Sequence, residues 1–123
     1  MRQTRLLIVL LAALALTPAV ALAHRLATKT ERAAIVTAVV RQHELSKAQA
    51  DCQAVTVSTV NSRFAKLTWP KKLSPACRRV AANGVIIEHK TSRGWHLVTV
   101  GSTLRCPIKG IPPRIARDLG VCS

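Results

Sequence analysis

The chain has 123 residues, which is enough for one domain and too few for a multidomain enzyme. Its 19 lysines and arginines outnumber its 5 acidic residues, and the formal charge of +14 excludes an acidic metal-buffering protein. The aromatic residues are Phe64, Trp69 and Trp95, and there is no tyrosine. Large surfaces for stacking on nucleic-acid bases are therefore not expected.

The first 23 residues have the pattern of a cleavable export signal. Arg2 and Arg5 form a positive start, residues 6–16 are uninterrupted apolar, and Pro18 follows. Residues 21–23 read Ala-Leu-Ala, which supplies the small residues that a signal peptidase requires. Cleavage there leaves one domain, residues 24–123, with a formal charge of +12. We expect this domain to be secreted, either extracellular or held in the cell envelope.

Two alternatives to this cleavage remain open. Cleavage could follow Ala21 instead, because Ala19 and Ala21 are also small. The segment could also be a membrane anchor, but a spanning helix needs about 20 apolar residues. The apolar stretch over residues 6–23 is shorter and is interrupted by Thr17 and Pro18. We therefore expect no membrane span in the mature chain.

The mature chain begins with a predicted helix over residues 29–42. Thr28 and Glu31 have the spacing of a capping box. Ile35 and Val39 lie at helical spacing and should face the core, with Arg32 and Arg41 on the wetter side. Residues 43–51 are predicted to be a polar connection.

The next predicted element is a strand over residues 52–60, which are rich in β-branched side chains. After a turn at residues 61–62, residues 64–69 could form a second short strand or one helical turn. Residues 70–82 contain two prolines and four bases, and we expect a long surface loop held by Cys77.

Residues 85–90 and 95–101 are predicted to form a β-hairpin, with Gly94 in a left-handed conformation after a three-residue loop. In this preferred register Thr91 lies opposite Trp95. The face packed on the helix would then carry Val85, Ile87, Trp95 and Leu97. In the alternative register, Lys90 lies opposite Trp95 and His89 lies directly opposite His96.

The tail is predicted to contain a short helix over residues 114–119, started by Pro112 and Pro113 and stopped by Gly120. The predicted fold class is α+β. An N-terminal helix packs on a small antiparallel sheet of three or four strands, and a disulfide-bonded tail with a short helix closes the domain.

Four cysteines in a short exported chain indicate disulfides. The local solution pairs Cys52 with Cys77 and Cys106 with Cys122, although sequence alone allows three pairings. Zinc binding is the competing interpretation, but no C-x-x-C pair occurs and the gaps do not match the usual ligand spacings. We expect no metal and no cofactor.

The C-terminal third carries a family resemblance. It contains Gly94-Trp95-His96-Leu97-Val98, then Cys106-Pro107, then the run Ile111-Pro112-Pro113 that leads to Asp118-Leu119-Gly120-Val121-Cys122. This tail resembles that of small secreted actinobacterial proteins of unknown function. The resemblance covers about half of the mature chain, and it implies a fold and a location but no chemistry.

Catalytic residues are hard to assemble from this sequence. The weak candidates are His89, His96 and Glu44, which could serve acid–base chemistry on a phosphodiester. Three of the other acids have structural explanations, namely capping for Glu31, the terminal helix for Asp118, and a cross-strand base such as Lys90 or Arg93 for Glu88, and Asp51 has none. Motifs for nucleotide binding and for serine nucleophiles are absent.

The positive charge therefore provides the main functional prediction. We expect a non-enzymatic protein whose partners are anionic envelope or extracellular polymers, or another extracellular protein, with no specific nucleic-acid target. The alternatives are a small secreted phosphodiester hydrolase and an inhibitor-like module that binds proteins through residues 70–82. The oligomeric state is left open. The predicted anion-binding residues are Lys66, Lys71, Lys72, Arg78, Arg79, Arg105, Lys109, Arg114 and Arg117.

Overall fold

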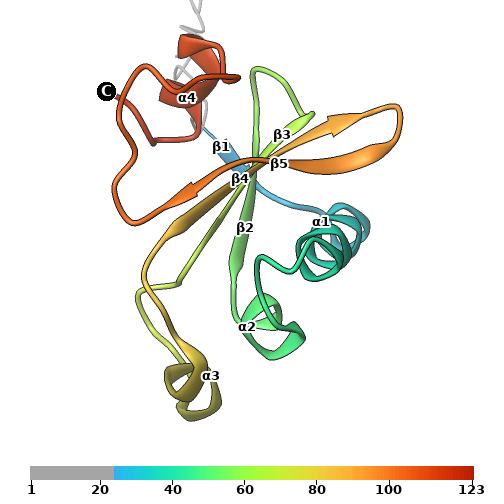
Figure 1. The fold of residues 1–123 in the computed structure, drawn as a ribbon, viewed down its shortest axis with the longest axis vertical. Coiled ribbons are helices and arrows are strands. Elements are labelled where there is room, and N and C mark those ends of the chain that lie inside the picture. Colours follow the sequence, from blue (N-terminus) through green and yellow to red (C-terminus); the bar gives the residue numbers. More distant parts are fainter. Residues whose placement is uncertain (1–23) are drawn as a thin grey trace, which may run out of the picture.

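Five antiparallel strands form one sheet, in which each strand pairs with the next one along the chain (Figure 1). The computed structural model describes residues 24–123, so the predicted export signal at residues 1–23 lies outside the described residues. The chain is α+β, but the sheet has five strands and not the predicted three or four. The strands are β1 (His24–Leu26), β2 (Ala54–Ser58), β3 (Phe64–Thr68), β4 (Val85–Thr91) and β5 (Gly94–Gly101).

β1 is the strand that the sequence analysis misses. Its three residues pair with the C-terminal end of β2, with His24 opposite Ser58 and Leu26 opposite Thr56. A run of three residues is too short to show the alternation by which strands are recognised. β1 forms because a sheet edge is available beside it.

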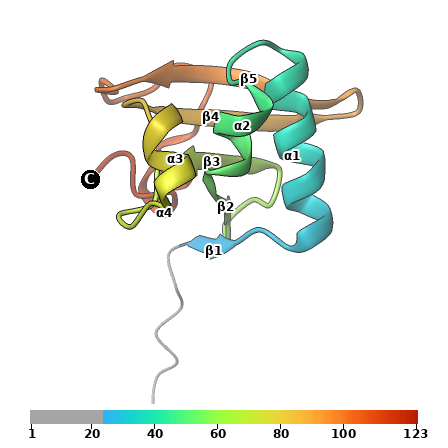
Figure 2. The same ribbon diagram turned by 90° about the horizontal axis from the view of Figure 1, so that it is seen from below.

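Four helices surround the sheet: α1 (Lys29–Arg41), α2 (Lys47–Asp51), α3 (Pro75–Val80) and α4 (Pro113–Asp118). α1 and α4 lie on opposite sides of the strands (Figure 1), and Figure 2 shows α2 between α1 and α3. No helix within residues 24–123 is long and apolar enough to cross a membrane.

Side-chain caps start three of the helices. Thr28 and Glu31 form the predicted capping box of α1. Ser46 and Gln49 form a second capping box, which starts α2 inside the segment predicted to be a polar connection. Ser74 caps α3, which lies inside the predicted surface loop. The loop predictions were therefore wrong over two short helices whose caps are visible in the sequence.

The first core lies between α1 and the sheet. Ile35 and Val39 face it, as predicted. The core consists of Ile35, Ala38 and Val39 of α1 packed on Val55, Val57, Ala65, Leu67, Ile86 and Trp95 of the sheet. Each fully buried aliphatic side chain contributes about 1.5–3 kcal/mol to folding by leaving water.

A second core covers the other face of the sheet, beneath α4 and the tail. The strands contribute Phe64 and Ile87, which alternate with residues of the first core. The tail contributes Ile108, Ile111, Ile115, Ala116 and Leu119. The sheet is therefore buried on both faces. The predicted packing of the hairpin on the N-terminal helix accounts for only one of them.

The β4–β5 hairpin adopts the alternative register. Thr91 pairs with Gly94, Lys90 with Trp95 and His89 with His96, so the preferred register with Thr91 opposite Trp95 was wrong. The Thr91 hydroxyl donates to the Gly94 carbonyl and accepts from the Arg93 amide, which stabilises a two-residue loop.

This register also corrects the predicted shared face. Trp95 and Leu97 pack on the α1 side, whereas Val85 and Ile87 belong to the second core. The indole of Trp95 is buried against α1 together with Ile86, and a slip of one residue would put Ile87 on that face in place of Ile86.

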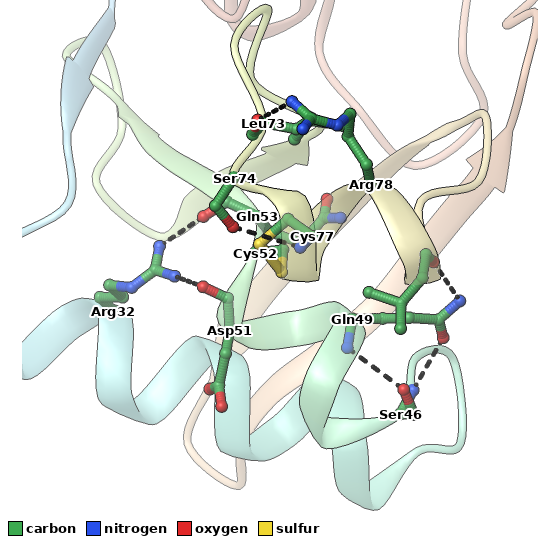
Figure 3. Close-up of a disulfide and its surroundings, with 11 residues drawn as sticks. Arg32, Ser46, Gln49, Asp51, Cys52, Gln53, Leu73, Ser74, Cys77 and Arg78 are labelled. Atoms are coloured by element: carbon green, nitrogen blue, oxygen red, sulfur yellow. Dashed lines mark hydrogen bonds between the residues drawn. A yellow bond between two sulfur atoms is a disulfide. The ribbon is translucent and has the colours of Figure 1, made fainter.

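Both predicted disulfides are present. Cys52–Cys77 joins the end of α2 to α3, as Figure 3 shows, and Cys106–Cys122 closes the tail. There are no free cysteines within residues 24–123. The two bridges hold the segments that have the least sheet pairing.

Asp118 at the end of α4 joins the tail to the sheet. Its carboxylate accepts hydrogen bonds from the Ser58 hydroxyl, and from the hydroxyl and backbone amide of Thr59, at 2.5–2.8 Å. Burial alone would raise the pKa of Asp118, but the bonds from Ser58, Thr59 and Val60 outweigh it, and the pKa is lowered. The terminal-helix explanation of this residue was therefore incomplete.

Glu88 is a carboxylate inside the first core. It is fully buried, and its cross-strand partners are Ala65 and Leu97, not a base. Neither carboxylate oxygen has a hydrogen-bond partner in the part of the chain that the structure describes. Burial, with a smaller contribution from Glu44, raises the pKa of Glu88 to about 7 against the opposing effects of Gln42 and Arg41. The predicted ion pair with Lys90 or Arg93 does not form.

Asp118→Ala is expected to lower the free energy of unfolding by about 3 kcal/mol at neutral pH, because the buried Ser58 hydroxyl and the two Thr59 donors lose a charged acceptor. The difference in unfolding free energy from wild type should shrink as the pH falls below 3.8, the ordinary pKa of the group. The reason is that the hydrogen bonds that lower the folded-state pKa stabilise only the ionised carboxylate. Urea unfolding measures both effects. The control is Asp51→Ala, whose exposed ion pair with Lys47 contributes less than about 1 kcal/mol. Equal losses in the two variants would contradict the role of Asp118.

Glu88→Gln is expected to remove a pH dependence. Because the pKa of Glu88 is raised in the folded state, its buried carboxyl costs no stability at pH values below its ordinary pKa of 4.5. The free energy of unfolding then falls as the pH rises through about 7. The wild-type loss should approach about 3 kcal/mol. Unfolding free energies measured at the two ends of this range should differ in wild type and coincide more closely in the variant. An identical pH profile for both proteins would show that Glu88 ionises freely in the folded state.

Candidate functional site

A cleft lies between β5 and the segment over residues 103–110 that follows it. It has a volume of about 650 Å³. The chain leaves the end of β5 and returns toward α4 (Figure 1), with Ile108 buried in the second core as an anchor. The cleft therefore forms where the tail separates from the sheet. Its polar lining consists of His89, Thr99, Thr103, Arg105 and Lys109.

Packing holds the imidazole of His89 in place. His89 pairs with Phe64 across β3 and β4, and the two rings stack with centroids 4.2 Å apart and an interplanar angle of 10°. His89 is half-buried, so one part of the ring packs on Phe64 while the residue lines the cleft. The sheet thus supplies a rigid wall with one polar ring.

The opposite wall supplies positive charge. Arg105 and Lys109 are exposed, and neither forms an ion pair or a side-chain hydrogen bond with any residue in 24–123. The cleft lining includes no aspartate or glutamate. Two free cations without a competing carboxylate favour an anionic ligand. The hydroxyls of Thr99 and Thr103 can donate hydrogen bonds to its oxygens.

A smaller hollow continues the positive surface around the tail. It has a volume of about 400 Å³, includes Arg117 of α4, and shares Ile108 with the cleft. Arg114 is exposed on the same helix. The tail therefore brings together four of the predicted anion-binding residues, two of them in the cleft.

The remaining predicted anion-binding residues lie elsewhere. Lys71, Lys72, Arg78 and Arg79 are exposed at and before α3, at the opposite end of the long axis from α4 (Figure 1). The Arg78 guanidinium donates to the Leu73 carbonyl (Figure 3). These four bases form a separate basic surface.

Lys66, which was also predicted to bind anions, does not join that surface. It points to the tail side of β3, where its ammonium donates to the Leu119 carbonyl. Burial lowers the pKa of Lys66. Its hydrogen bond attaches the end of α4 to the sheet, which is a structural role that its position within β3 alone did not reveal.

The weak catalytic candidates are divided by the sheet. His89 and His96 are directly opposed neighbours on β4 and β5, whereas Glu44 follows α1 on the other side. His96 is exposed and His89 lines the cleft. The structure thus brings the two histidines together and excludes Glu44 from their site. No group of three or more His, Cys, Asp or Glu residues within 24–123 could hold a metal ion.

Sequence reasoning missed the threonines of the cleft. Thr99 lies on β5 and Thr103 just after it, and no motif marks either residue. The one sequence signal for a shared site was that both threonines lie close to Arg105 along the chain. Comparison with known proteins adds no assignment: no family model, no curated protein and no solved structure matches this chain.

Proposed function

We propose that this protein is a secreted, non-enzymatic binding protein for anionic envelope or extracellular polymers. The observation that carries the proposal is the convergence of Arg105, Lys109 and His89 on a cleft lined by no carboxylate. A negatively charged repeating unit, such as a phosphodiester, matches this lining because its oxygens accept from guanidinium, ammonium and hydroxyl donors.

Several features support a polymer rather than a single small anion. The hollow with Arg117 adjoins the cleft at Ile108, so positive charge extends beyond one ligand-sized site. A chain of anionic units could contact both hollows, and each contact would release counterions.

The location of such a polymer agrees with the export prediction. Two disulfides are typical of proteins that function in an oxidising compartment. The tail's resemblance to small secreted actinobacterial proteins points the same way. Wall teichoic acid is a polymer of this charge at that location, and it is the natural first probe.

Arg105→Ala/Lys109→Ala is expected to weaken binding of purified wall teichoic acid about tenfold and to reduce its salt dependence by about one unit per cation removed. Binding of the labelled polymer can be followed by fluorescence anisotropy. Wild-type binding should be largely lost at about 0.5 M salt, because exposed charges are then screened.

The matched control is Lys71→Ala/Lys72→Ala, which removes the same charge at the other end of the molecule. This variant should retain most of the wild-type affinity. If both double variants lose affinity equally, net charge alone governs binding and the cleft has no special role. Wild-type binding that ignores salt would also contradict the proposal.

A second candidate function rests on the hairpin register. Because His89 and His96 are direct cross-strand neighbours, their Cβ atoms are about 5 Å apart. One imidazole could take a proton from the 2′-hydroxyl of RNA while the other gives a proton to the leaving oxygen. Arg105 and Lys109 could hold the phosphate. This arrangement favours metal-independent phosphodiester cleavage as the alternative.

His96→Ala separates the two functions. If the protein is a hydrolase, this variant should lose RNA cleavage by a factor of about 100 or more, measured in the presence of a chelator. His96 is exposed, so the change should leave stability intact. His43→Ala, at an exposed histidine after α1, is the control. No cleavage by wild type, or equal cleavage by all three proteins, would eliminate the hydrolase.

A further inference from the structure

A hollow of about 170 Å³ lies on the α1 side of the molecule, around the edge of β5 from the basic cleft. It is enclosed by the segment after α1, by α2, and by the residues that precede β4. Its polar lining is Glu44, Gln49, Gln53 and Asn83, with Trp69 beside them. No lysine or arginine lines it, although the chain has 19.

Gln53 is the residue that points to a ligand. It is 4 % exposed, and its side-chain amide nitrogen has no hydrogen-bond partner within residues 24–123. Figure 3 shows this amide beside the Cys52–Cys77 bridge, with no hydrogen bond drawn to it. Its backbone is already satisfied, because the carbonyl accepts from Arg32 and the amide donates to Ala50. A buried donor without an acceptor is costly, so an occupant of the hollow should offer an acceptor oxygen.

Glu44 requires a hydrogen-bond donor on the ligand, whereas Gln53 requires an acceptor. Its carboxylate forms no ion pair or hydrogen bond within residues 24–123, and an ionised carboxylate can only accept. Gln49 adds little, because its amide already accepts from Ser46 and donates to the Val80 carbonyl (Figure 3). The occupant must therefore both donate to Glu44 and accept from Gln53, which is the behaviour of a hydroxyl group.

The shape and apolar part of the hollow restrict the occupant further. Trp69 offers a flat apolar ring with a polar edge, and Leu45 and Ile86 complete that wall. The volume lies below the roughly 300–1,000 Å³ of pockets for drug-sized ligands. An occupant with an apolar face, hydroxyl groups at its rim and the size of one small ring meets these conditions.

We propose that this hollow binds one neutral sugar residue, with its C–H face on Trp69 and its hydroxyls on Glu44 and Gln53. A phosphate or other anion would be repelled by Glu44 and would find no base. An ammonium group would satisfy Glu44 but would leave the Gln53 amide without an acceptor. The site shares only Val100, at the edge of β5, with the lining of the basic cleft and none of its bases, so the inference does not depend on the proposed function.

The test is a titration of ¹⁵N-labelled protein with D-glucose, D-galactose, D-mannose and N-acetyl-D-glucosamine, each alone. At least one sugar should shift the Gln53 side-chain amide and the Trp69 indole signals in a saturable way. The shifts should persist at about 0.5 M salt, because the ligand is neutral. Arg105→Ala/Lys109→Ala should bind the sugar as wild type does, which separates this test from that of the anionic polymer.

Gln53→Met and Trp69→Ala are each expected to weaken sugar binding about tenfold or more. Gln53→Met keeps the side-chain length and removes an unsatisfied buried amide, so it should fold at least as stably as wild type. Absence of saturable shifts with every sugar would overturn the proposal. So would unchanged affinity in Gln53→Met, or a response to methylammonium chloride in place of the sugars, which would identify a cation site.

Discussion

The central strands of the sheet are apolar on both faces, and this constraint shapes the rest of the molecule. Leu67 and Ile86 face α1, whereas Phe64 and Ile87 face the other way. A sheet of this kind must be covered on both sides to keep apolar surface from water. The C-terminal tail supplies the second cover, and the hydrogen bonds to Asp118, together with the Cys106–Cys122 bridge, hold it in place.

The way the tail folds back also determines the charge of the surface. None of the five acidic side chains lines the basic cleft: Glu31 and Asp51 pair with Arg25 and Lys47, Asp118 binds hydroxyls, Glu88 is buried and Glu44 lines another hollow. The exposed bases of the tail therefore face solvent without neutralising partners. The cleft beside β5 is positive because the acids are elsewhere, as much as because Arg105 and Lys109 are present.

Local signals in the sequence predicted most of the elements but not their pairing partners. Capping boxes and β-branched runs are short-range features, so α1, β2 and the β4–β5 hairpin could be anticipated. The register of that hairpin could not, since a slip of one residue leaves local propensities almost unchanged while it reverses every side chain. The tertiary packing settles it: Ile86 shares the α1 face with Trp95, whereas Ile87 packs beneath the tail, and both contacts join distant segments.

The sequence by itself determined a small, basic α+β domain with four cysteines, and of their three possible pairings it favoured the local one. These properties depend on composition and on short spacings along the chain. Only the tertiary structure decided which polar side chains lie together. It placed His89 opposite His96 and in the same cleft as Arg105. It placed Glu44 on the other side of the sheet and gave Lys66 a carbonyl partner in the tail. Such groupings join residues from separate strands and loops, whose positions are set by how both faces of the sheet are covered.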